Sequence, residues 1–467
     1  MRFKALLSNL GFVLQMSGLF ILLPIILSFI DNDMVAAVAL FAAAIVFLAL
    51  GFLLNALCER KELTYKQSCT LIVLVFMLLS IIGAIPYFYI NISQGDFLSN
   101  ITDSLFESAS GFTTTGFSVI PNLSTIPRSI VFYRALTQFI GGIGIVLVML
   151  AFFYPEAKLL EFFRSMGFNQ KQKIKRTFLL ILLIYVSYTF IMIFIGLLFG
   201  YHDIITLVSF IFSALSTGGF APINNLSTMV TQFPLNFILL LGSILGACNF
   251  LVLAGLFKGK IKEFIRSEIS VFFLLLIVSV LVVIYIFGFP VFDALFTVVN
   301  AMSTTGFGYL SVANFSDGLK LFLVFLMFIG GASFSTAGGI KIYRFLLMFK
   351  AANKAIKENI TQKDAPLRLF GKEYSNLEVI HSLVVVLSMI GLIFGSACLI
   401  SLYGFEPVNA VFDVTSALAN VGLSTGIAGQ PLALELKWLF ILLMLFGRVE
   451  ILAVFIMFSR TKEPKES

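Results

Sequence analysis

Long apolar stretches are the feature that most constrains this chain. Of its 467 residues, 59% are hydrophobic and only 12% are charged, whereas a soluble protein averages about 25% charged residues. A helix needs about 20 apolar residues to cross a bilayer. Ten such spans are predicted, near residues 8–30, 34–57, 68–90, 128–153, 177–200, 233–257, 269–288, 318–350, 378–403 and 433–459. The chain is therefore predicted to be an all-α polytopic membrane protein without a large soluble domain.

The basic residues lie mostly in short connections and at the chain ends. A net charge of +7 could suggest nucleic-acid binding, but the basic clusters are the segments 58–66, 171–176, 258–266 and 350–372. Short basic loops mark the cytoplasmic side of a membrane protein. Ten spans put both termini on one side, and both "MRFK" and "SRTKEPKES" are basic. We therefore expect cytoplasmic termini, lipid contact and no nucleic-acid partner, and the same loops could bind a cytoplasmic protein.

Four segments align without gaps after the third, fifth, seventh and ninth spans. They read "DSLFESASGFTTTGF" (103–117), "TLVSFIFSALSTGGF" (206–220), "DALFTVVNAMSTTGF" (293–307) and "NAVFDVTSALANVGL" (409–423), and they place Gly116, Gly219, Gly306 and Gly422 in one column. Thirteen residues earlier stand Asp103, Thr206, Asp293 and Asn409, which we take as helix N-caps. The residues between predict a helix of roughly 15 Å, half the hydrocarbon thickness. A half-length helix followed by glycine-rich backbone indicates a re-entrant pore loop.

A second column of glycines extends the repeat. Gly141, Gly246, Gly331 and Gly447 follow the first column by 25 to 27 residues. The resulting domains are two extra N-terminal transmembrane helices (1–60) and four pore repeats (68–155, 175–260, 268–350 and 375–460). Four membrane–pore–membrane repeats predict a pseudo-fourfold arrangement around a central axis.

Non-helical backbone at membrane depth must be buried in protein or line a water-filled cavity. Rings of carbonyl oxygens from four such loops can replace the hydration shell of a monovalent cation, and the C-terminal ends of the short helices favour a cation. The loop segments 113–117, 216–220, 303–307 and 419–423 contain no Asp or Glu, which a calcium filter would usually have. Potassium is thus the first choice of ion and sodium the second.

These motifs resemble those of the Trk/Ktr/HKT superfamily of potassium transporters, most of all its bacterial TrkH branch. The matching stretches are "GFTTTGFS" (111–118), "SALSTGGF" (213–220), "NAMSTTGFG" (300–308), "SALANVGLSTG" (416–426), "YRALTQFIGGIGIVLV" (133–148), "GGASFSTAGGIKIYR" (330–344) and "FGRVEI" (446–451). The resemblance covers nearly the whole chain. It implies a selectivity filter whose ion ligands are Thr114, Thr115, Gly116, Thr217, Gly218, Gly219, Thr304, Thr305, Gly306, Asn420, Val421 and Gly422.

Within the superfamily, a serine at the first column position goes with sodium permeation in plant relatives, so Gly116 favours potassium. The fourth loop departs from the threonine pattern, having Asn420, Val421 and Leu423. A sodium-permeable transporter of the same fold remains the alternative function.

An intramembrane gate is implied at residues 330–341, where four glycines and three hydroxyl residues interrupt the eighth span. The gate residues are Gly330, Gly331, Ala332, Ser333, Ser335, Thr336, Gly338, Gly339 and, in the last span, Arg448. A glycine-rich kink for close packing and a structural ion pair of Arg448 with another helix are the alternatives. Glu450 would point away from Arg448 on the same helix. Arg134 and Gln138 are expected either to hydrogen-bond behind the filter or, for the arginine, to reach the membrane surface.

The resemblance also implies a homodimer in the bacterial cytoplasmic (inner) membrane and a TrkA-like nucleotide-binding regulatory ring as cytoplasmic partner. The chain has no Walker motif or dinucleotide-binding fingerprint, so nucleotide control would come through that partner, at the basic loops 171–176 and 350–372. We expect no cofactor, and K⁺ is the transported ligand.

An intramembrane protease is the remote alternative, because Ser333 could act as a nucleophile. Its base would have to be His202 or His381, the only histidines in the chain, and both are predicted near the membrane faces. The sequence also lacks an HExxH motif. No enzymatic activity is therefore expected.

Overall fold

The fold is almost entirely helical. The computed structural model describes residues 2–56, 63–93, 95–153, 174–256, 259, 261–361, 366–370, 372–429 and 432–459. Its elements are α1 (Arg2–Phe20), α2 (Leu22–Ile30), α3 (Met34–Ala56), α4 (Tyr65–Gly83), α5 (Ile85–Tyr89), α6 (Phe97–Phe112), η1 (Leu123–Thr125), α7 (Arg128–Phe153), α9 (Ile174–Leu198), α10 (Ile204–Leu215), α11 (Ser227–Val230), α12 (Leu235–Ala247), α13 (Phe250–Leu256), α14 (Ile261–Ile265), α15 (Glu268–Phe287), α16 (Val291–Met302), η2 (Val312–Asn314), α17 (Asp317–Ile329), α18 (Ile342–Thr361), β1 (Leu367–Leu369), β2 (Lys372–Tyr374), α19 (Asn376–Leu402), α20 (Pro407–Leu418), α21 (Leu434–Val449) and α22 (Ile451–Phe458). The predictions for the basic segment 171–176 and the tail after residue 459 lie partly or wholly outside the described residues.

Six helical segments of the described chain are long and apolar enough to cross a membrane without a sharp break. They are residues 4–30, 34–56, 66–89, 179–198, 268–287 and 376–402. These segments coincide with the first, second, third, fifth, seventh and ninth predicted spans, and the fourth predicted span falls on α7. The protein is a multi-pass, all-α membrane protein, as predicted.

The sixth, eighth and tenth predicted spans are each broken in two. Cys248 and Asn249 separate α12 from α13, and residues 330–341 separate α17 from α18. Between α21 and α22 the chain bends by 90°, at Glu450, whose φ is +59°. The eighth span breaks where predicted, and the sixth and tenth spans, for which no break was predicted, are broken as well. An ion pair of Glu450 with Arg344, 2.7 Å long, holds the last bend, and such a distant partner leaves no local signal.

Four short helices, α6, α10, α16 and α20, lead into the aligned loops. Their N-cap residues are Asp96, Asp203, Pro290 and Glu406. The N-caps predicted thirteen residues before the column glycines are wrong, because Asp103, Thr206, Asp293 and Asn409 all lie inside these helices. The helices start earlier because residues further upstream serve as their N-caps. Asp203, for example, accepts a hydrogen bond from the backbone N–H of Thr206 at 3.4 Å.

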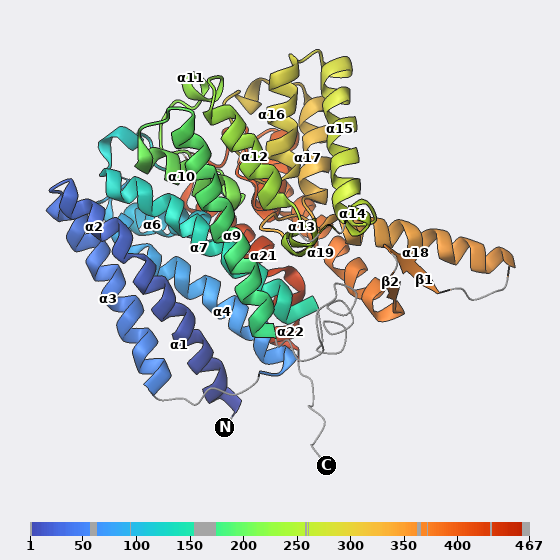
Figure 1. Ribbon diagram of the computed structural model, residues 1–467, viewed down its shortest axis with the longest axis horizontal. Coiled ribbons are helices and arrows are strands. Elements are labelled where there is room, and N and C mark those ends of the chain that lie inside the picture. The colour runs from blue at the N-terminus through green and yellow to red at the C-terminus, as the bar shows by residue number, and fades with distance from the viewer. Residues whose placement is uncertain are drawn as a thin grey trace.

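The short helices pack in a cycle. Each one contacts the second helix of the preceding repeat: α10 packs on α7, α16 on α12, α20 on α17, and α6 on α21, which closes the circle. Figure 1 shows α1, α2 and α3 at one edge of this arrangement, where α1 runs along α3. This packing places the ends of the four short helices in the interior of the protein.

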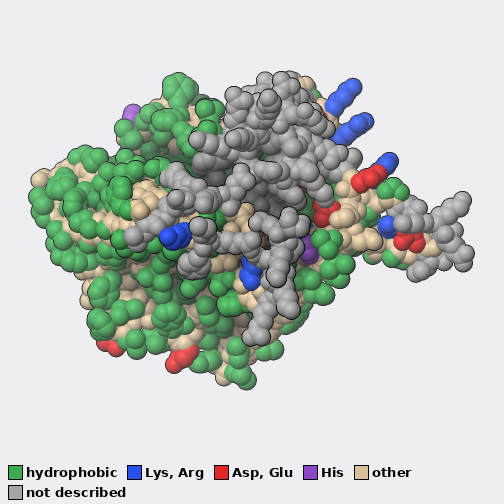
Figure 2. Space-filling view, turned by 90° about the horizontal axis from the view of Figure 1, so that it is seen from below, with side chains coloured by type: hydrophobic (Ala, Val, Ile, Leu, Met, Phe, Trp, Pro, Cys, Tyr) green, Lys and Arg blue, Asp and Glu red, His purple; other side chains and the backbone are tan. Residues whose placement is uncertain are grey.

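A small projection stands at the opposite edge from α1 (Figure 1), formed by α18 and the β1–β2 hairpin. The strands pair antiparallel with Arg368 opposite Glu373, and Leu367 and Leu369 pack on Leu347 of α18. Figure 2 shows hydrophobic side chains over much of the described part of the face turned to the viewer, while Lys and Arg side chains gather mainly toward this projection. Large exposed apolar side chains, such as Tyr285 and Phe52, match a lipid-facing surface.

Candidate functional site

The four short helices end in the same backbone conformation. Thr114, Thr217, Thr304 and Asn420 are all left-handed, with φ between 52° and 57°. The next N–H then donates to a carbonyl five residues back, as from Thr115 to Ser110 at 2.9 Å. This is a Schellman motif, which usually has glycine at the left-handed position. A left-handed residue with a Cβ costs about 1–2 kcal/mol, so threonine or asparagine in all four copies indicates that the side chain is needed there.

The column glycines close the loops into a ring. We call the segments 113–117, 216–220, 303–307 and 419–423 loops 1 to 4. Gly116 has φ +91°, and a Cβ on it would overlap the carbonyl oxygen of Gly218 in loop 2. The same relation runs from Gly219 to Thr305, from Gly306 to Val421, and from Gly422 back to Thr115. Four glycines at equivalent positions are required because backbone of the next loop occupies the space of a side chain.

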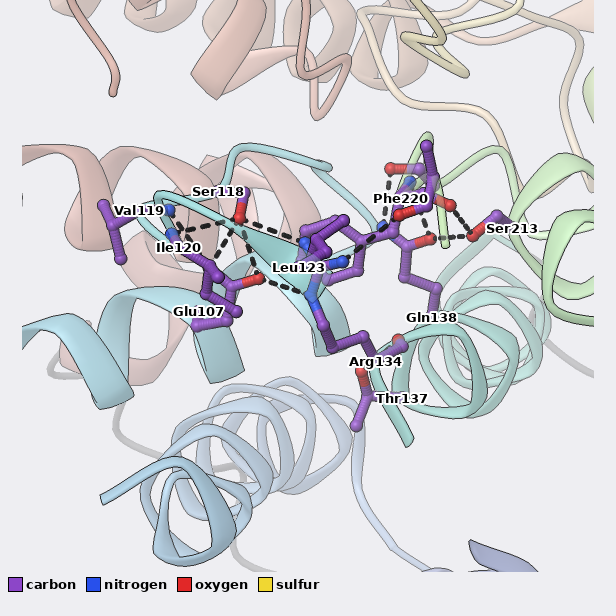
Figure 3. A network of polar contacts seen from close by, with 12 residues as sticks. Glu107, Ser118, Val119, Ile120, Leu123, Arg134, Thr137, Gln138, Ser213 and Phe220 are labelled. Carbon is purple, nitrogen blue, oxygen red and sulfur yellow. Dashed lines mark hydrogen bonds and ion pairs between the residues drawn. The ribbon is translucent and has the colours of Figure 1, made fainter. Parts of the chain in front are cut away.

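Loop 2 departs from this symmetry. The side-chain amide of Gln138 donates to the carbonyl oxygen of Gly218 at 2.6 Å, and its oxygen accepts from the N–H of Phe220 at 3.2 Å and from Ser213 Oγ at 2.6 Å. Figure 3 shows Gln138 reaching this loop from α7. A carbonyl oxygen has two lone pairs, so the oxygen of Gly218 keeps one acceptor site beside this bond.

Arg134, one turn from Gln138, lies behind loop 1. It is 2% exposed, and its Nε donates to Glu107 of α6 at 2.7 Å. Its guanidinium also donates to Ser118 Oγ at 3.0 Å and lies 4.1 Å from the ring centroid of Phe220. Figure 3 shows this arginine between the outer ends of loops 1 and 2. The prediction that Arg134 and Gln138 hydrogen-bond behind the loops is confirmed, and the alternative of a surface arginine is wrong.

Residues 330–341 form a non-helical segment with turns, and it contacts the loops from the C-terminal side of the short helices. Thr336 Oγ1 donates to the carbonyl of Leu215, the last residue of α10, at 2.9 Å. The N–H of Gly338 donates to Thr304 Oγ1 of loop 3 at 2.7 Å. A Cβ on Gly338 would overlap the carbonyl oxygen of Ala419 in loop 4. Thr217 Oγ1 of loop 2 donates to Thr336 Oγ1 at 3.3 Å, so the segment lies directly against three of the four loops.

The segment is fixed at its other side by neighbouring helices. The N–H groups of Ala332 and Thr336 donate to the carbonyls of Ala247 and Gly246 at 3.0 Å, at the C-terminal end of α12. The N–H of Ser333 donates to Glu268, the first residue of α15, at 2.8 Å. Gly330, Gly331, Ser335 and Gly339 belong to the same segment. The predicted gate residues of 330–341 are thus brought together, with backbone rather than side chains making most of the contacts.

Arg448 lies under the ring and is 1% exposed. Its guanidinium donates to the carbonyls of Thr336 at 3.0 Å and Gly141 at 2.7 Å. Within the described part of the chain no carboxylate pairs with it, and Glu450 binds Arg344 instead. Among the described residues, the hypothesis of a structural ion pair for Arg448 therefore has no support, while the expectation that Glu450 is not its partner is confirmed.

The second glycine column is a set of close packing contacts in three repeats. A Cβ on Gly141, Gly246 or Gly447 would lie within contact of the last carbonyl of the short helix in the same repeat, at Phe112, Leu215 or Leu418. Gly331 differs, since it faces Ala337 and the carbonyl of Ala247. Repeat 3 lacks this helix–helix contact because its second helix, α17, ends at Ile329, before Gly331.

Replacing Gly141 by alanine is expected to lower the thermal stability of the protein. Gly to Ala inside a helix normally gains about 1 kcal/mol, but here the new methyl would overlap the carbonyl of Phe112, and overpacking costs typically about 1–3 kcal/mol. The melting temperature in detergent should therefore fall. Gly144→Ala on the same helix is the control, because its methyl would meet only Phe76, at 3.4 Å. Equal melting temperatures for the two variants would contradict the close-packing role.

Several buried polar residues were not singled out from the sequence. Lys437 of α21 donates to Asp103 inside α6, Glu107 receives Arg134, and Asp413 accepts four hydrogen bonds. Each partner lies more than ten residues away in the sequence. The sequence did contain one signal for these residues, a charged side chain inside a short apolar helix. That signal does not identify the residue with which the charge pairs.

A closed ring of four loops between spanning helices defines a class of membrane transport protein, and comparison with known proteins agrees. The family described as "Cation transport protein" (TrkH) matches residues 36–289 and 265–467. An uncharacterized cation transporter of Methanocaldococcus jannaschii is 32% identical, over 98% of this chain and 95% of the relative. The Trk system potassium uptake protein TrkH of Escherichia coli K12 is 27% identical, over 86% and 87%.

The chain belongs to the TrkH family of cation transport proteins. The crystal structure of the potassium transporter TrkH from Vibrio parahaemolyticus shares its fold, with a TM-score of 0.80, 24% sequence identity, and 98% and 99% of the two chains covered. These relatives are transporters, so the protein is a transporter and not an enzyme.

Proposed function

We propose that this protein takes up potassium ions through the ring formed by loops 1 to 4, which acts as its selectivity filter. The observation that carries the proposal is a closed cycle of contacts. Each column glycine faces a carbonyl oxygen in the next loop, and that oxygen belongs to the residue just before the next loop's column glycine. Such a ring presents backbone oxygens from four sides, as a dehydrated monovalent cation requires. The curated relatives named as potassium uptake proteins support potassium as the ion.

The ligands in this proposal come from four equivalent tripeptides. They are Thr114, Thr115 and Gly116; Thr217, Gly218 and Gly219; Thr304, Thr305 and Gly306; and Asn420, Val421 and Gly422. In the described part of the chain, Thr114 Oγ1 is buried without a hydrogen-bond partner. A buried hydroxyl usually has a partner, so this oxygen is a candidate ligand at the inner end of the filter.

Uptake of ⁸⁶Rb⁺ and ²²Na⁺ into proteoliposomes tests the function directly. Rubidium replaces potassium as tracer, and we expect rubidium uptake well above sodium uptake, with unlabelled K⁺ competing. Sodium uptake equal to rubidium uptake would favour the sodium-permeable alternative. Empty liposomes give the background for both tracers.

The segment 330–341 and Arg448 form the gate in this proposal. The segment contacts loops 3 and 4 through Gly338, and Arg448 ties it to α7 through the carbonyl of Gly141. Glycines at positive φ, Gly330 and Gly339, give the segment backbone freedom at both ends. Movement of this segment would open the path on the inner side of the filter.

Regulation would reach the gate from the cytoplasm. We place both termini there and the protein in the bacterial cytoplasmic membrane, as a homodimer with a TrkA-like nucleotide-binding ring as partner. The projecting α18 and β1–β2 hairpin carry basic side chains such as Lys350 and Arg368, and α18 begins directly after the gate segment. Co-purification of the ring, and its loss when these basic residues are neutralised, tests this arrangement.

A further inference from the structure

Two buried carboxylates occupy the same position in different repeats. Glu107 in α6 and Asp413 in α20 each lie nine residues before the column glycine of their loop, and both are fully buried. The equivalent residues in repeats 2 and 3 are Phe210 and Thr297. A buried carboxylate is costly unless it is fully hydrogen-bonded, so its presence in two repeats calls for a specific role.

Both carboxylates bind the outer end of their own loop in the same way. Glu107 accepts from Ser118 Oγ and from the N–H of Val119, each at 3.1 Å. Asp413 accepts from Ser424 Oγ at 2.5 Å and from the N–H of Thr425 at 2.7 Å. The two serines each follow the column glycine by two residues. Figure 3 shows the first of these contacts, where Glu107 reaches Ser118 and Val119.

In loops 2 and 3, the backbone N–H that follows the column glycine is bound by a neutral side chain instead, although the hydroxyl of Tyr309, beyond loop 3, donates to Asp293 of α16. The N–H of Phe307 donates to the Asn300 side chain at 3.0 Å, and that of Phe220 donates to Gln138. Phe210 packs its ring against Phe307, with the centroids 6.2 Å apart. In the ring order, loop 4 adjoins loop 1, so the two carboxylates support neighbouring loops on one side of the ring.

The two carboxylates differ in charge balance. Arg134 neutralises Glu107 at 2.7 Å, whereas no basic side chain of the described chain lies within 4.0 Å of Asp413. Asp413 accepts two further bonds, from Thr425 Oγ1 and from the N–H of Ala428, both at 2.9 Å. Four bonds fill the four lone-pair sites of a carboxylate. The carboxyl group behind loop 4 is therefore held by hydrogen bonds alone.

Loop 4 also lacks the internal support of its neighbours. In loops 1 and 3, a hydroxyl pair spans the loop at 2.7 Å, from Thr113 to Thr115 and from Ser303 to Thr305. Loop 4 has Ala419 and Val421 at these two positions, so its chain cannot form this pair. At the outer end of loop 4, the hydrogen bonds to Asp413 take the place of this hydroxyl pair.

We propose that Glu107 and Asp413 are positioning residues that fix the outer ends of filter loops 1 and 4, and that Asp413 in particular sets the selectivity for K⁺ over Na⁺. The inference rests on the proposed function, because it assumes that the ring is the filter. Discrimination between the two ions depends on where the carbonyl oxygens are held. Asp413 acts through Ser424, Thr425 and Ala428 and does not touch the ion.

Asp413→Asn is the principal test, with ⁸⁶Rb⁺ and ²²Na⁺ uptake measured in the same proteoliposomes. In the asparagine side chain, an NH₂ group replaces one carboxylate oxygen and cannot accept from the N–H of Thr425 or Ala428. At least one hydrogen bond is therefore lost together with the charge. Because hydrogen bonds to charged groups contribute strongly, we expect the rubidium-to-sodium ratio to fall by about tenfold. Thr297→Val is the matched control, since it changes the equivalent residue behind loop 3 and should leave the ratio unchanged.

A second variant tests the same inference if the Asp413→Asn protein folds too poorly to be purified. The double variant Ser424→Ala and Thr425→Val keeps the carboxylate and its backbone bonds but removes both hydroxyl donors, and it should lower the ratio in the same direction. An unchanged ratio with a lowered melting temperature, in either variant, would show a purely structural role and overturn the inference. A wild-type ratio near one would instead overturn the proposed function, and the inference with it.

Discussion

Gly116→Ser is expected to lower the rubidium-to-sodium uptake ratio by about tenfold or more, since each ~1.4 kcal/mol of lost discrimination is a factor of ten. The residue has φ +91°, where a side chain is strained, and its Cβ would overlap the carbonyl oxygen of Gly218. The serine would displace an oxygen that also accepts from Gln138. Loops 1 and 2 would both move, so the spacing of the oxygens would change across half of the ring.

Gly308→Ser is the control for this variant. Gly308 is exposed and lies two residues after Gly306, at the repeat position where loops 1 and 4 already have Ser118 and Ser424. An added Cβ would contact only Leu423 closely, at 3.3 Å. Its uptake ratio should equal that of the wild type. A Gly116→Ser protein that folds normally and keeps the wild-type ratio would contradict the assignment of this glycine to the filter.

The loops were predictable because their signals are local and repeated. Each left-handed glycine and the short helix that precedes it are neighbours in the sequence. Four aligned copies therefore identify the loops without any knowledge of the residues that contact them. The break at residues 330–341 was predictable for the same reason, as its glycines form two pairs, 330–331 and 338–339, close together in the sequence. In both cases the backbone conformation itself restricts which residues fit.

Apart from those of Arg134 and Gln138, the contacts that hold the loops were not predictable. Asp103 is a good N-cap residue by type, yet it lies inside α6 and binds Lys437, which is 334 positions away in the sequence. Glu450 ends one helix and begins another because Arg344 binds it. Side-chain chemistry showed that each such residue needs a partner, but only the fold determines which residue supplies it.

Arg448→Ala is expected to raise rubidium uptake about tenfold, because lowering a barrier by ~1.4 kcal/mol has that effect. The side chain holds the gate segment through the carbonyl of Thr336 and places a buried positive charge under the ring. Hydrogen bonds to charged groups are worth about 1.5–3 kcal/mol, so their removal both frees the segment and removes a repulsion on the cation. The measurement is initial ⁸⁶Rb⁺ uptake per folded protein in proteoliposomes.

Two further variants separate the charge from general disturbance of the protein. Arg448→Lys keeps the charge and should stay closer to the wild type than Arg448→Ala, because one ammonium group can still donate to the carbonyls of Thr336 and Gly141. Arg128→Ala removes an arginine whose side chain is 49% exposed and paired with Asp203, and uptake should not change. Unchanged or reduced uptake by well-folded Arg448→Ala would mean that the arginine supports the open path rather than the barrier, and the gate would then have to be assigned to the 330–341 backbone alone.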